Sequence, residues 1–354
     1  MTHLWVRAES RANEERAGIT PEGVASLVAQ GFSVTVEDSP HRVLPTEDYA
    51  RAGAVIAPPG SWPTAPDDAI VFGLKELPDD GLPLRHRHVM FGHAFKGQPA
   101  GQVLLRRFQA GGGHLYDLEY LTDDAGRRLA AFGYWAGYAG AAVSLKAWVA
   151  QQGGGLCGPV HAYADKELWL DELRAQLDAT ARPRPHALVI GAKGRVGTGA
   201  ADLLVALGVP VTRWDMAETA HGGPFPQVLA HELFINAILA QPGAPVFVPE
   251  SAVAPGRRLT VIGDVACDPA SDFSPIKVYD RTTTWDQPVL RVADNPPLDV
   301  MAIDNLPSLL PRESSEDYAG QLLPVLAQLD RIDEGPWGRA GALFRTHRDR
   351  LTQT

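Results

Sequence analysis

The run ALVIGAKGRVGTGAADLLVALG, residues 187–208, constrains the fold of this chain more than any other feature. A β-branched stretch ends at Gly191, and further glycines follow at Gly194, Gly197 and Gly199. An amphipathic helix is predicted over residues 200–207. Glycines placed in this way permit a tight turn and let a pyrophosphate approach the backbone at a helix N-terminus. The run therefore predicts the strand, turn and helix of a dinucleotide-binding fold.

An acidic residue follows the next predicted strand. The segment VPVTRWD ends in Asp215, 24 residues after Gly191. A carboxylate there accepts both ribose hydroxyls of NAD and repels the 2′-phosphate of NADP, although Arg213 nearby leaves NADP open. Glycines that only close a strand-to-helix turn are the simpler alternative. Strand, turn, helix, strand and acid in this order favour NAD.

Strand and helix patterns alternate in two series, one before residue 100 and one from residue 187 onward. Such alternation is typical of mostly parallel sheets, and 354 residues suffice for about two domains. We expect an α/β protein with two Rossmann-like domains and an active-site cleft between them. Residues 1–131 plus 310–354 are predicted to form the substrate and catalytic domain, and residues 132–309 the NAD-binding domain. A long buried helix is expected over 130–151, and a terminal helix is expected to return to the first domain.

Composition narrows the possible partners. The formal charge of −10 and pI near 5.5 disfavour nucleic acid, so small molecules are the expected partners. Cys157 and Cys267 lie far apart without metal-ligand spacing, which predicts two free thiols in a reducing cytosol and no metal. No segment has the pattern of a leader peptide or a membrane span, so we expect a cytoplasmic protein.

Polar side chains follow two apolar runs of the first series. AIVFGLKELP brings Lys75 and Glu76 to a strand end, and VMFGHAFKGQ places His93 eighteen residues after Lys75, with Lys96 and Gln98 beyond it. Adjacent parallel strands would bring Lys75 and His93 to the sheet edge where ligands bind. A lysine in a partly dry cleft is a usable proton acceptor, and a histidine titrates near neutrality. A solvated Lys75–Glu76 pair and a core histidine remain the alternatives.

Charged residues continue through HLYDLEYLTDDAGRRLAAFG. Glu119 follows an apolar strand, and Arg127 and Arg128 enter the next apolar segment. Paired arginines bind carboxylate or phosphate in bidentate fashion, but a surface pair with Asp123 and Asp124 fits the spacing equally well. Arg16 precedes a predicted helix start, where an anion is also favoured.

Several runs resemble the NAD-dependent, lysine-forming saccharopine dehydrogenases: RAGITPEGV, GLKELP, LYDLEYL, GRRLAAFGYWAGYAGAA and IDNLPSLLPRESS. More distantly, the chain is similar to alanine dehydrogenase and the NAD-binding subunit of transhydrogenase. The resemblance implies that Lys75 accepts the amine proton, that His93 handles protons during imine hydrolysis, and that Glu76 and Glu119 tune these two groups. It implies substrate binding by Arg16, Gln98, Arg128 and Phe132, and Lys96, just beyond His93, is a further substrate-binding candidate. The turn and the resemblance together give as cofactor-binding residues Arg127, Gly191, Gly194, Arg195, Gly197, Asp215, Thr219, Leu239, Val265, Ile303, Asp304, Asn305 and Leu306.

The chain departs from the family pattern in several places. Asn305 stands where the family has histidine, and Leu239 stands where it has tyrosine. Val196 and Ala237 replace two cysteines able to pair, and the loop after Asp264 diverges. The resemblance implies oxidation of saccharopine to lysine and 2-oxoglutarate by a monomeric enzyme. A related opine or amino-acid dehydrogenase with a different amine and oxo acid is the alternative, followed by a non-catalytic NAD sensor.

Overall fold

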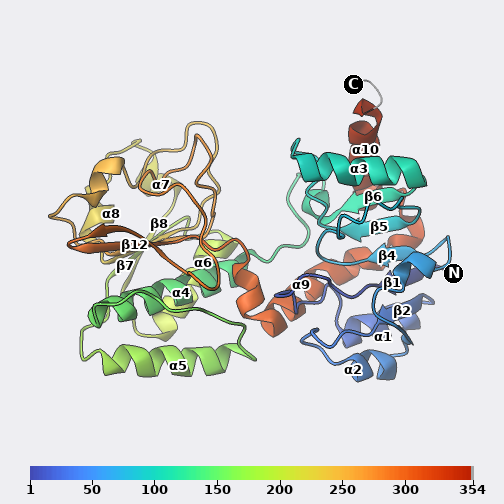
Figure 1. Cartoon of the computed structure of the whole chain (residues 1–354), viewed down its shortest axis with the longest axis horizontal. Helices are drawn as coiled ribbons and strands as arrows, with labels where there is room; N and C mark the ends of the chain where they lie inside the picture. The colour runs from blue at the N-terminus through green and yellow to red at the C-terminus, as the bar shows by residue number, and fades with distance from the viewer. Residues whose placement is uncertain (352–354) are drawn as a thin grey trace. The chain divides into compact units, whose positions relative to one another are not determined.

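A computed structural model describes residues 1–351 and divides into two compact units. Unit 1 comprises residues 1–131 together with the chain from Pro311 onward, and unit 2 comprises Phe132–Leu310. Figure 1 shows the chain coloured from the N-terminus to the C-terminus, with the α-helices and most strands labelled.

Unit 1 contains a six-stranded sheet in the order β3-β2-β1-β4-β5-β6, and all of its strand pairs are parallel. The strands are β1 (His3–Val6), β2 (Ser33–Glu37), β3 (Val55–Ala57), β4 (Ile70–Phe72), β5 (Arg87–Met90) and β6 (His114–Asp117). This order is that of a Rossmann fold, which binds ligands at the carboxyl ends of the strands where the order reverses. In unit 1 that point lies between β1 and β4.

Five α-helices surround this sheet: α1 (Pro21–Ala29), α2 (Thr46–Arg51), α3 (Pro99–Gly111), α9 (Pro311–Leu326) and α10 (Gly335–Arg350). Thr20 caps α1 by accepting the Gly23 amide at 3.2 Å, Pro21 opens the helix, and Gly31 follows it at φ 89°. These are the start and stop signals that the sequence shows. Figure 1 shows α3 and α10 beyond β6 and α1 and α2 beyond β2.

Unit 2 repeats this architecture with one reversed edge. Its sheet order is β11-β12-β10-β9-β7-β8, and only the edge pair β11–β12 is antiparallel. The strands are β7 (Ala187–Ile190), β8 (Val211–Trp214), β9 (Leu233–Asn236), β10 (Val261–Asp264), β11 (Leu290–Asp294) and β12 (Pro297–Met301). The fold class expected from the sequence is confirmed: two Rossmann-like units with mostly parallel sheets.

The helices of unit 2 are α4 (Gly133–Gln152), α5 (Lys166–Ala179), α6 (Arg195–Ala206), α7 (Met216–Thr219) and α8 (Pro226–Ala230). Helix α4 is the long buried helix expected from the sequence. It packs directly on α6 because glycines line the contact: a Cβ on Gly137 would collide with the Val196 carbonyl, and one on Gly199 with the Tyr134 carbonyl. Backbone therefore meets backbone without intervening side chains.

Two sequence predictions of helix extent are wrong. Helix α6 begins at Arg195, five residues before the predicted start at 200. The C-terminal segment holds two α-helices instead of one, α9 and α10, joined through the short 3₁₀-helix Leu329–Arg331. The remaining 3₁₀-helices are Trp62–Thr64, Leu118–Tyr120, Glu250–Val253 and Leu306–Leu309.

Candidate active site

The polar groups of unit 1 lie at the carboxyl edge of its sheet, after β4, β5 and β6. Strands β4 and β5 are adjacent and parallel, with Ile70 in register with Arg87. Lys75 lies three residues beyond the end of β4, and His93 lies three residues beyond the end of β5. The structure therefore brings both side chains to the carboxyl edge of the sheet, in the turns after the strands and not on the strands themselves.

The backbone of Lys75 is held from both sides. The Glu9 carboxylate accepts the amides of Leu74 at 2.6 Å and Lys75 at 3.0 Å, while the Arg7 guanidinium donates to the Lys75 carbonyl. Arg7 also pairs with Glu9 at 3.3 Å. Gly73 completes this arrangement, since a Cβ there would collide with the Arg7 side chain. Arg7 and Glu9 belong to the loop after β1, and no sequence pattern pointed to them.

Two acids near Lys75 are themselves paired with arginines. Glu76 forms an ion pair with Arg11, and Glu14 receives two hydrogen bonds from Arg16, at 2.7 and 2.6 Å. Burial opposes ionisation of both carboxyls. Even so, hydrogen bonding and the nearby arginine and Lys75 charges lower the pKa of each one. Arg16 is only 4% exposed, so the predicted carboxylate ligand lies buried against Glu14.

Glu119 is the centre of the second cluster. Its Oε1 accepts from Lys96 Nζ at 2.8 Å and from Arg128 Nη2 at 2.9 Å, and its Oε2 lies 3.7 Å from His93 Nδ1. The His93 imidazole, followed by Lys96 and Arg128, lowers the pKa of Glu119 to about 2. The carboxylate is therefore charged throughout the working pH range, and it links the predicted acid-base group to two predicted substrate ligands.

His93 has an uncommon backbone conformation, with φ 48°. A non-glycine residue in this region is strained by about 1–3 kcal/mol, and such residues concentrate at functional sites. Arg127 lies apart from the cluster. Its Nε donates to Asp123 at 2.9 Å and its side chain is 81% exposed, so for this residue the surface pair weighed from the sequence is present.

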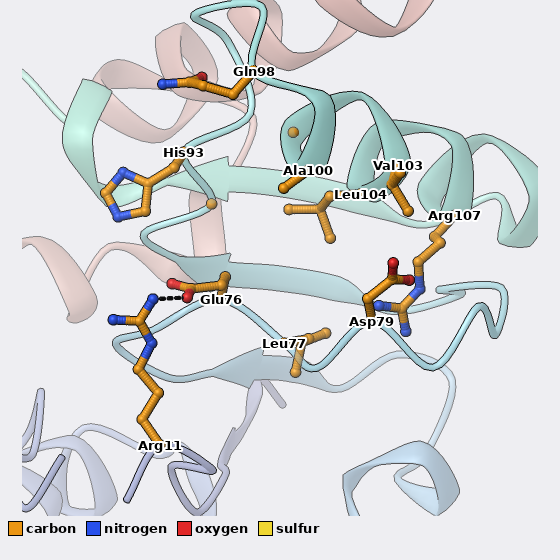
Figure 2. Close-up of a pocket in the computed structure, with 12 residues that line it drawn as sticks. Arg11, Glu76, Leu77, Asp79, His93, Gln98, Ala100, Val103, Leu104 and Arg107 are labelled. Atoms are coloured by element: carbon orange, nitrogen blue, oxygen red, sulfur yellow. Dashed lines mark hydrogen bonds and ion pairs between the residues drawn. The ribbon is translucent and has the colours of Figure 1, made fainter. Parts of the chain in front are cut away.

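A pocket of about 290 Å³ opens beside His93. Figure 2 shows His93 and Gln98 at one end, Asp79 and Arg107 at the other, and Leu77 and Leu104 between them. Gln98 directly precedes α3. The pocket therefore has apolar walls along its length, polar groups at one end and charged groups at the other.

Unit 2 carries a larger pocket, of about 550 Å³, at its own switch point between β7 and β9. Four predicted cofactor residues line it: Gly191, Asp215, Thr219 and Leu239. Gly191 has φ 87°, and a Cβ on Gly197 would collide with the Gly191 carbonyl. Gly194 is the N-cap of α6 and makes no side-chain cap, and Arg195 is the first residue of that helix. The turn thus leaves open backbone where a pyrophosphate would bind.

The Asp215 carboxylate is fixed in place at the end of β8. Oδ2 accepts the Lys193 amide and Oδ1 accepts the Met216 amide, both at 2.9 Å. These two hydrogen bonds lower the pKa of Asp215, so the group is anionic at neutral pH. An oriented carboxylate above an open glycine turn fits the adenosine half of NAD.

Apart from Arg127, the other predicted cofactor residues lie at the same edge of this sheet but outside the pocket. Val265 follows β10, and Ile303 to Leu306 follow β12. Ile303 and Leu306 are 2% and 1% exposed and belong to the core of unit 2, so their side chains are not available to a ligand. Asp304 is exposed and Asn305 is half-buried. Phe132, which was predicted to bind substrate, is the N-cap residue of α4.

Comparisons with known proteins show the family of the chain. Residues 5–139 match the family described as alanine dehydrogenase/PNT, N-terminal domain. Saccharopine dehydrogenase (NAD(+), L-lysine-forming) of Schizosaccharomyces pombe is 42% identical over 97% of this chain and 98% of its own. The protein of the same name from Candida glabrata is 43% identical over 97% of this chain and 96% of its own. The chain belongs to the lysine-forming saccharopine dehydrogenase family.

Two solved structures share the fold of this saccharopine dehydrogenase family member. L-alanine dehydrogenase matches with a TM-score of 0.67 and 21% identity over 93% of this chain and 90% of that chain. A transhydrogenase from Sinorhizobium meliloti matches with a TM-score of 0.66 and 16% identity over 95% and 97%. In the part of the chain that the structure describes, no helix is both long and apolar enough to cross a membrane.

Proposed function

We propose that this protein catalyses the reversible NAD-dependent cleavage of saccharopine to L-lysine and 2-oxoglutarate. The observation that carries the proposal is the placement of Lys75 and His93 after adjacent parallel strands in a member of the saccharopine dehydrogenase family. A protein that only sensed NAD would need the glycine turn of unit 2 but not this acid-base pair. The oxidation consumes saccharopine, NAD⁺ and water and yields lysine, 2-oxoglutarate, NADH and a proton.

Lys75 is the proposed proton acceptor. Oxidation of a secondary amine requires the nitrogen to be neutral, and Lys75 would take its proton. Glu9 and Arg7 fix the Lys75 backbone, which limits the positions its amine can reach. NAD, when bound through the glycine turn and Asp215, supplies the acceptor for the hydride that leaves the adjacent carbon.

His93 is the proposed group for hydrolysis of the resulting iminium. Its imidazole would take a proton from the attacking water and return one to the nitrogen as the carbinolamine collapses. Glu119 stabilises the protonated imidazole at 3.7 Å. Arg128 and Lys96, both held by Glu119, remain half-exposed and are the proposed partners of substrate carboxylates.

The pocket beside His93 suits the amine half of the substrate. Leu77, Val103 and Leu104 give it apolar sides that match an aliphatic chain, and the Asp79 carboxylate at its far end would attract an ammonium group. We therefore place the butyl chain of the lysine moiety in this pocket. A monomeric, cytoplasmic enzyme is the accompanying proposal, and light scattering of the purified protein tests the first part.

Spectrophotometry tests the activity. NADH absorbance at 340 nm is followed with lysine plus 2-oxoglutarate, and then with other pairs of amine and oxo acid. Rapid NADH loss with the lysine pair is expected. Turnover with a different amine alone would refute saccharopine as the substrate, and tight NADH binding without turnover on any pair would refute an enzymatic role.

A further inference from the structure

Asp117 is a buried carboxylate directly behind the His93 cluster. It is the last residue of β6 and is 0% exposed. Its Oδ1 accepts the Glu119 amide at 2.9 Å, so it fixes the backbone of the residue that holds His93, Lys96 and Arg128. Its Oδ2 is buried and has no donor in full hydrogen-bond geometry among the described residues, although the nearby Gly92 amide lowers the pKa of this carboxyl. A buried carboxylate oxygen without a partner is costly, which calls for a reason beyond packing.

The loop before His93 rests on this carboxylate. Strands β5 and β6 are in register with Met90 opposite Asp117, so the loop residue Gly92 passes over the carboxyl group. A Cβ on Gly92 would come within 3.4 Å of Asp117 Oδ2 and within 2.8 Å of Leu115 Cδ2. A larger residue at this position would require the Leu115 side chain to shift, and the next residue is His93 in its strained backbone conformation. Asp117 is thus packed against the segment that aims the imidazole.

The two acids of this strand end ionise in different pH ranges. Burial and the negative charge of Glu119 raise the pKa of Asp117 to about 6, against the opposing effects of His93 and the nearby backbone amides. Glu119, two residues later, has a pKa of about 2. Paired carboxyls with separated pKa values are typical of sites where protons move. The charged and titratable groups that face this pair are His93, Lys96, Tyr120, Arg128 and Tyr318.

We propose that Asp117 is a positioning residue for the proton transfers of His93: it fixes the Glu119 backbone and balances the positive charge that the imidazole acquires. The proposal rests on the acid-base role of His93 given above. Asp117 touches neither substrate nor cofactor in this scheme and acts through Glu119 and the loop at Gly92. Its negative charge favours the imidazolium, so its removal disfavours protonation of His93.

Asp117→Asn tests the proposal because the amide oxygen still accepts the Glu119 amide while the charge is lost. Glu37→Gln is the matched control. Glu37 is an equally buried carboxylate at the end of β2, but its oxygens accept four N–H groups, from Trp5, Ala8, Gly60 and Trp62, at 2.6 to 3.0 Å. A purely structural role predicts the same behaviour for both variants.

The pH profile of kcat is measured for the wild type and both variants. The inflection that is present in the wild type and absent in His93→Gln is assigned to His93. In Asp117→Asn this inflection should move to lower pH by about one unit, an ordinary size for a charge effect on a side chain in a folded protein, because the charge that acts on His93 is lost. Glu37→Gln should lower the melting temperature without moving the inflection. An unmoved inflection in Asp117→Asn, or an equal shift in Glu37→Gln, overturns the proposal.

A second readout does not depend on turnover. NMR titration of the His93 ring, assigned with His93→Gln, should show the same downward shift in Asp117→Asn even if the substrate proposal fails. An unchanged titration would refute the role of Asp117 whatever the substrate. Asp117→Ser, which keeps a short acceptor for Glu119, replaces Asp117→Asn if the latter does not fold, and the same two outcomes then decide.

Discussion

Asp215 offers the sharpest test of cofactor choice, through the substitution Asp215→Ser. Serine retains a hydroxyl that can cap α7 and bind one ribose hydroxyl, so the local fold should survive. What disappears is a fixed negative charge at the 550 Å³ pocket, held there by the amides of Lys193 and Met216. The substitution should therefore weaken NAD binding and improve NADP binding at the same time.

The size of both effects follows from the position of the charge. A carboxylate ~5 Å from a doubly charged 2′-phosphate, at an effective dielectric of about 40, is repelled by ~3 kcal/mol, or about 100-fold in affinity. Loss of a charge-assisted hydrogen bond to the ribose weakens NAD binding by about 1.5–3 kcal/mol, part of which the serine hydroxyl restores. The NAD/NADP preference in kcat/KM should fall by about three orders of magnitude.

The assay compares kcat/KM for NADH and NADPH with lysine and 2-oxoglutarate, and titration calorimetry gives Kd for both cofactors. Glu218→Gln is the matched control. This substitution removes one charge from the same helix, at a residue that does not line the pocket. The glutamine amide oxygen can still accept the Asp215 N–H, which lies 2.7 Å from Glu218 Oε2 in the wild type. A preference that changes less than about threefold in Asp215→Ser, or equally in Glu218→Gln, would refute the reasoning.

Three further predictions concern catalysis, substrate and stability. Lys75→Met should lower kcat for saccharopine oxidation by a factor of about 10²–10⁴ and leave the Kd of NADH within about threefold of the wild-type value, because the substitution removes a general base but no cofactor contact. A parallel loss of NADH binding, measured by calorimetry, would show that Lys75 is misplaced. Val103→Trp should fill the 290 Å³ pocket and raise KM for lysine about tenfold, with little change in KM for 2-oxoglutarate. Gln102→Trp, on the exposed side of α3, should change neither KM. Equal effects of Val103→Trp on both KM values would place the lysine chain elsewhere. His88 is 1% exposed and burial holds its pKa well below 6.5, so its contribution to stability is fully present above pH 6.5 and is lost progressively below that pH as the unfolded state takes up the proton. His88→Phe, between Trp62 and Phe108, should reduce the drop in melting temperature between pH 7 and 5, and the exposed His41→Gln should not; the same drop in His88→Phe would contradict this account.

Local sequence pattern was sufficient for the dinucleotide turn and for the placement of Lys75 and His93 after adjacent parallel strands. Both depend on a short run of chain whose strand, glycine and cap residues act within a few positions of one another. The early start of α6 was not predictable in this way. Arg195 to Gly199 includes two glycines and a threonine, all weak helix formers, and the helix forms there because α4 packs backbone against backbone on it.

The missed residues share a different cause. Glu9 acts on Lys75 across 66 positions of sequence, and Arg7 does so across 68, so no local pattern connects them. Asp117 had a signal in principle, since LYDLEY places two acids two residues apart at a strand end. What the sequence could not show is that one acid is buried against Gly92 while the other is held among three cationic or titratable groups.

The two units share one topology, and a single position explains why only one of them should take the dinucleotide. In each unit an acid stands at the end of the second strand along the chain. Glu37 is the last residue of β2 in unit 1, and Asp215 directly follows β8 in unit 2. Trp5, Ala8, Gly60 and Trp62 supply four N–H donors to Glu37, which is 0% exposed and has no room for ribose hydroxyls. The Asp215 carboxylate instead lines an open pocket above a glycine turn. The same strand-end acid thus closes the nucleotide position of unit 1 and leaves its switch point to Lys75, while in unit 2 it remains available to NAD.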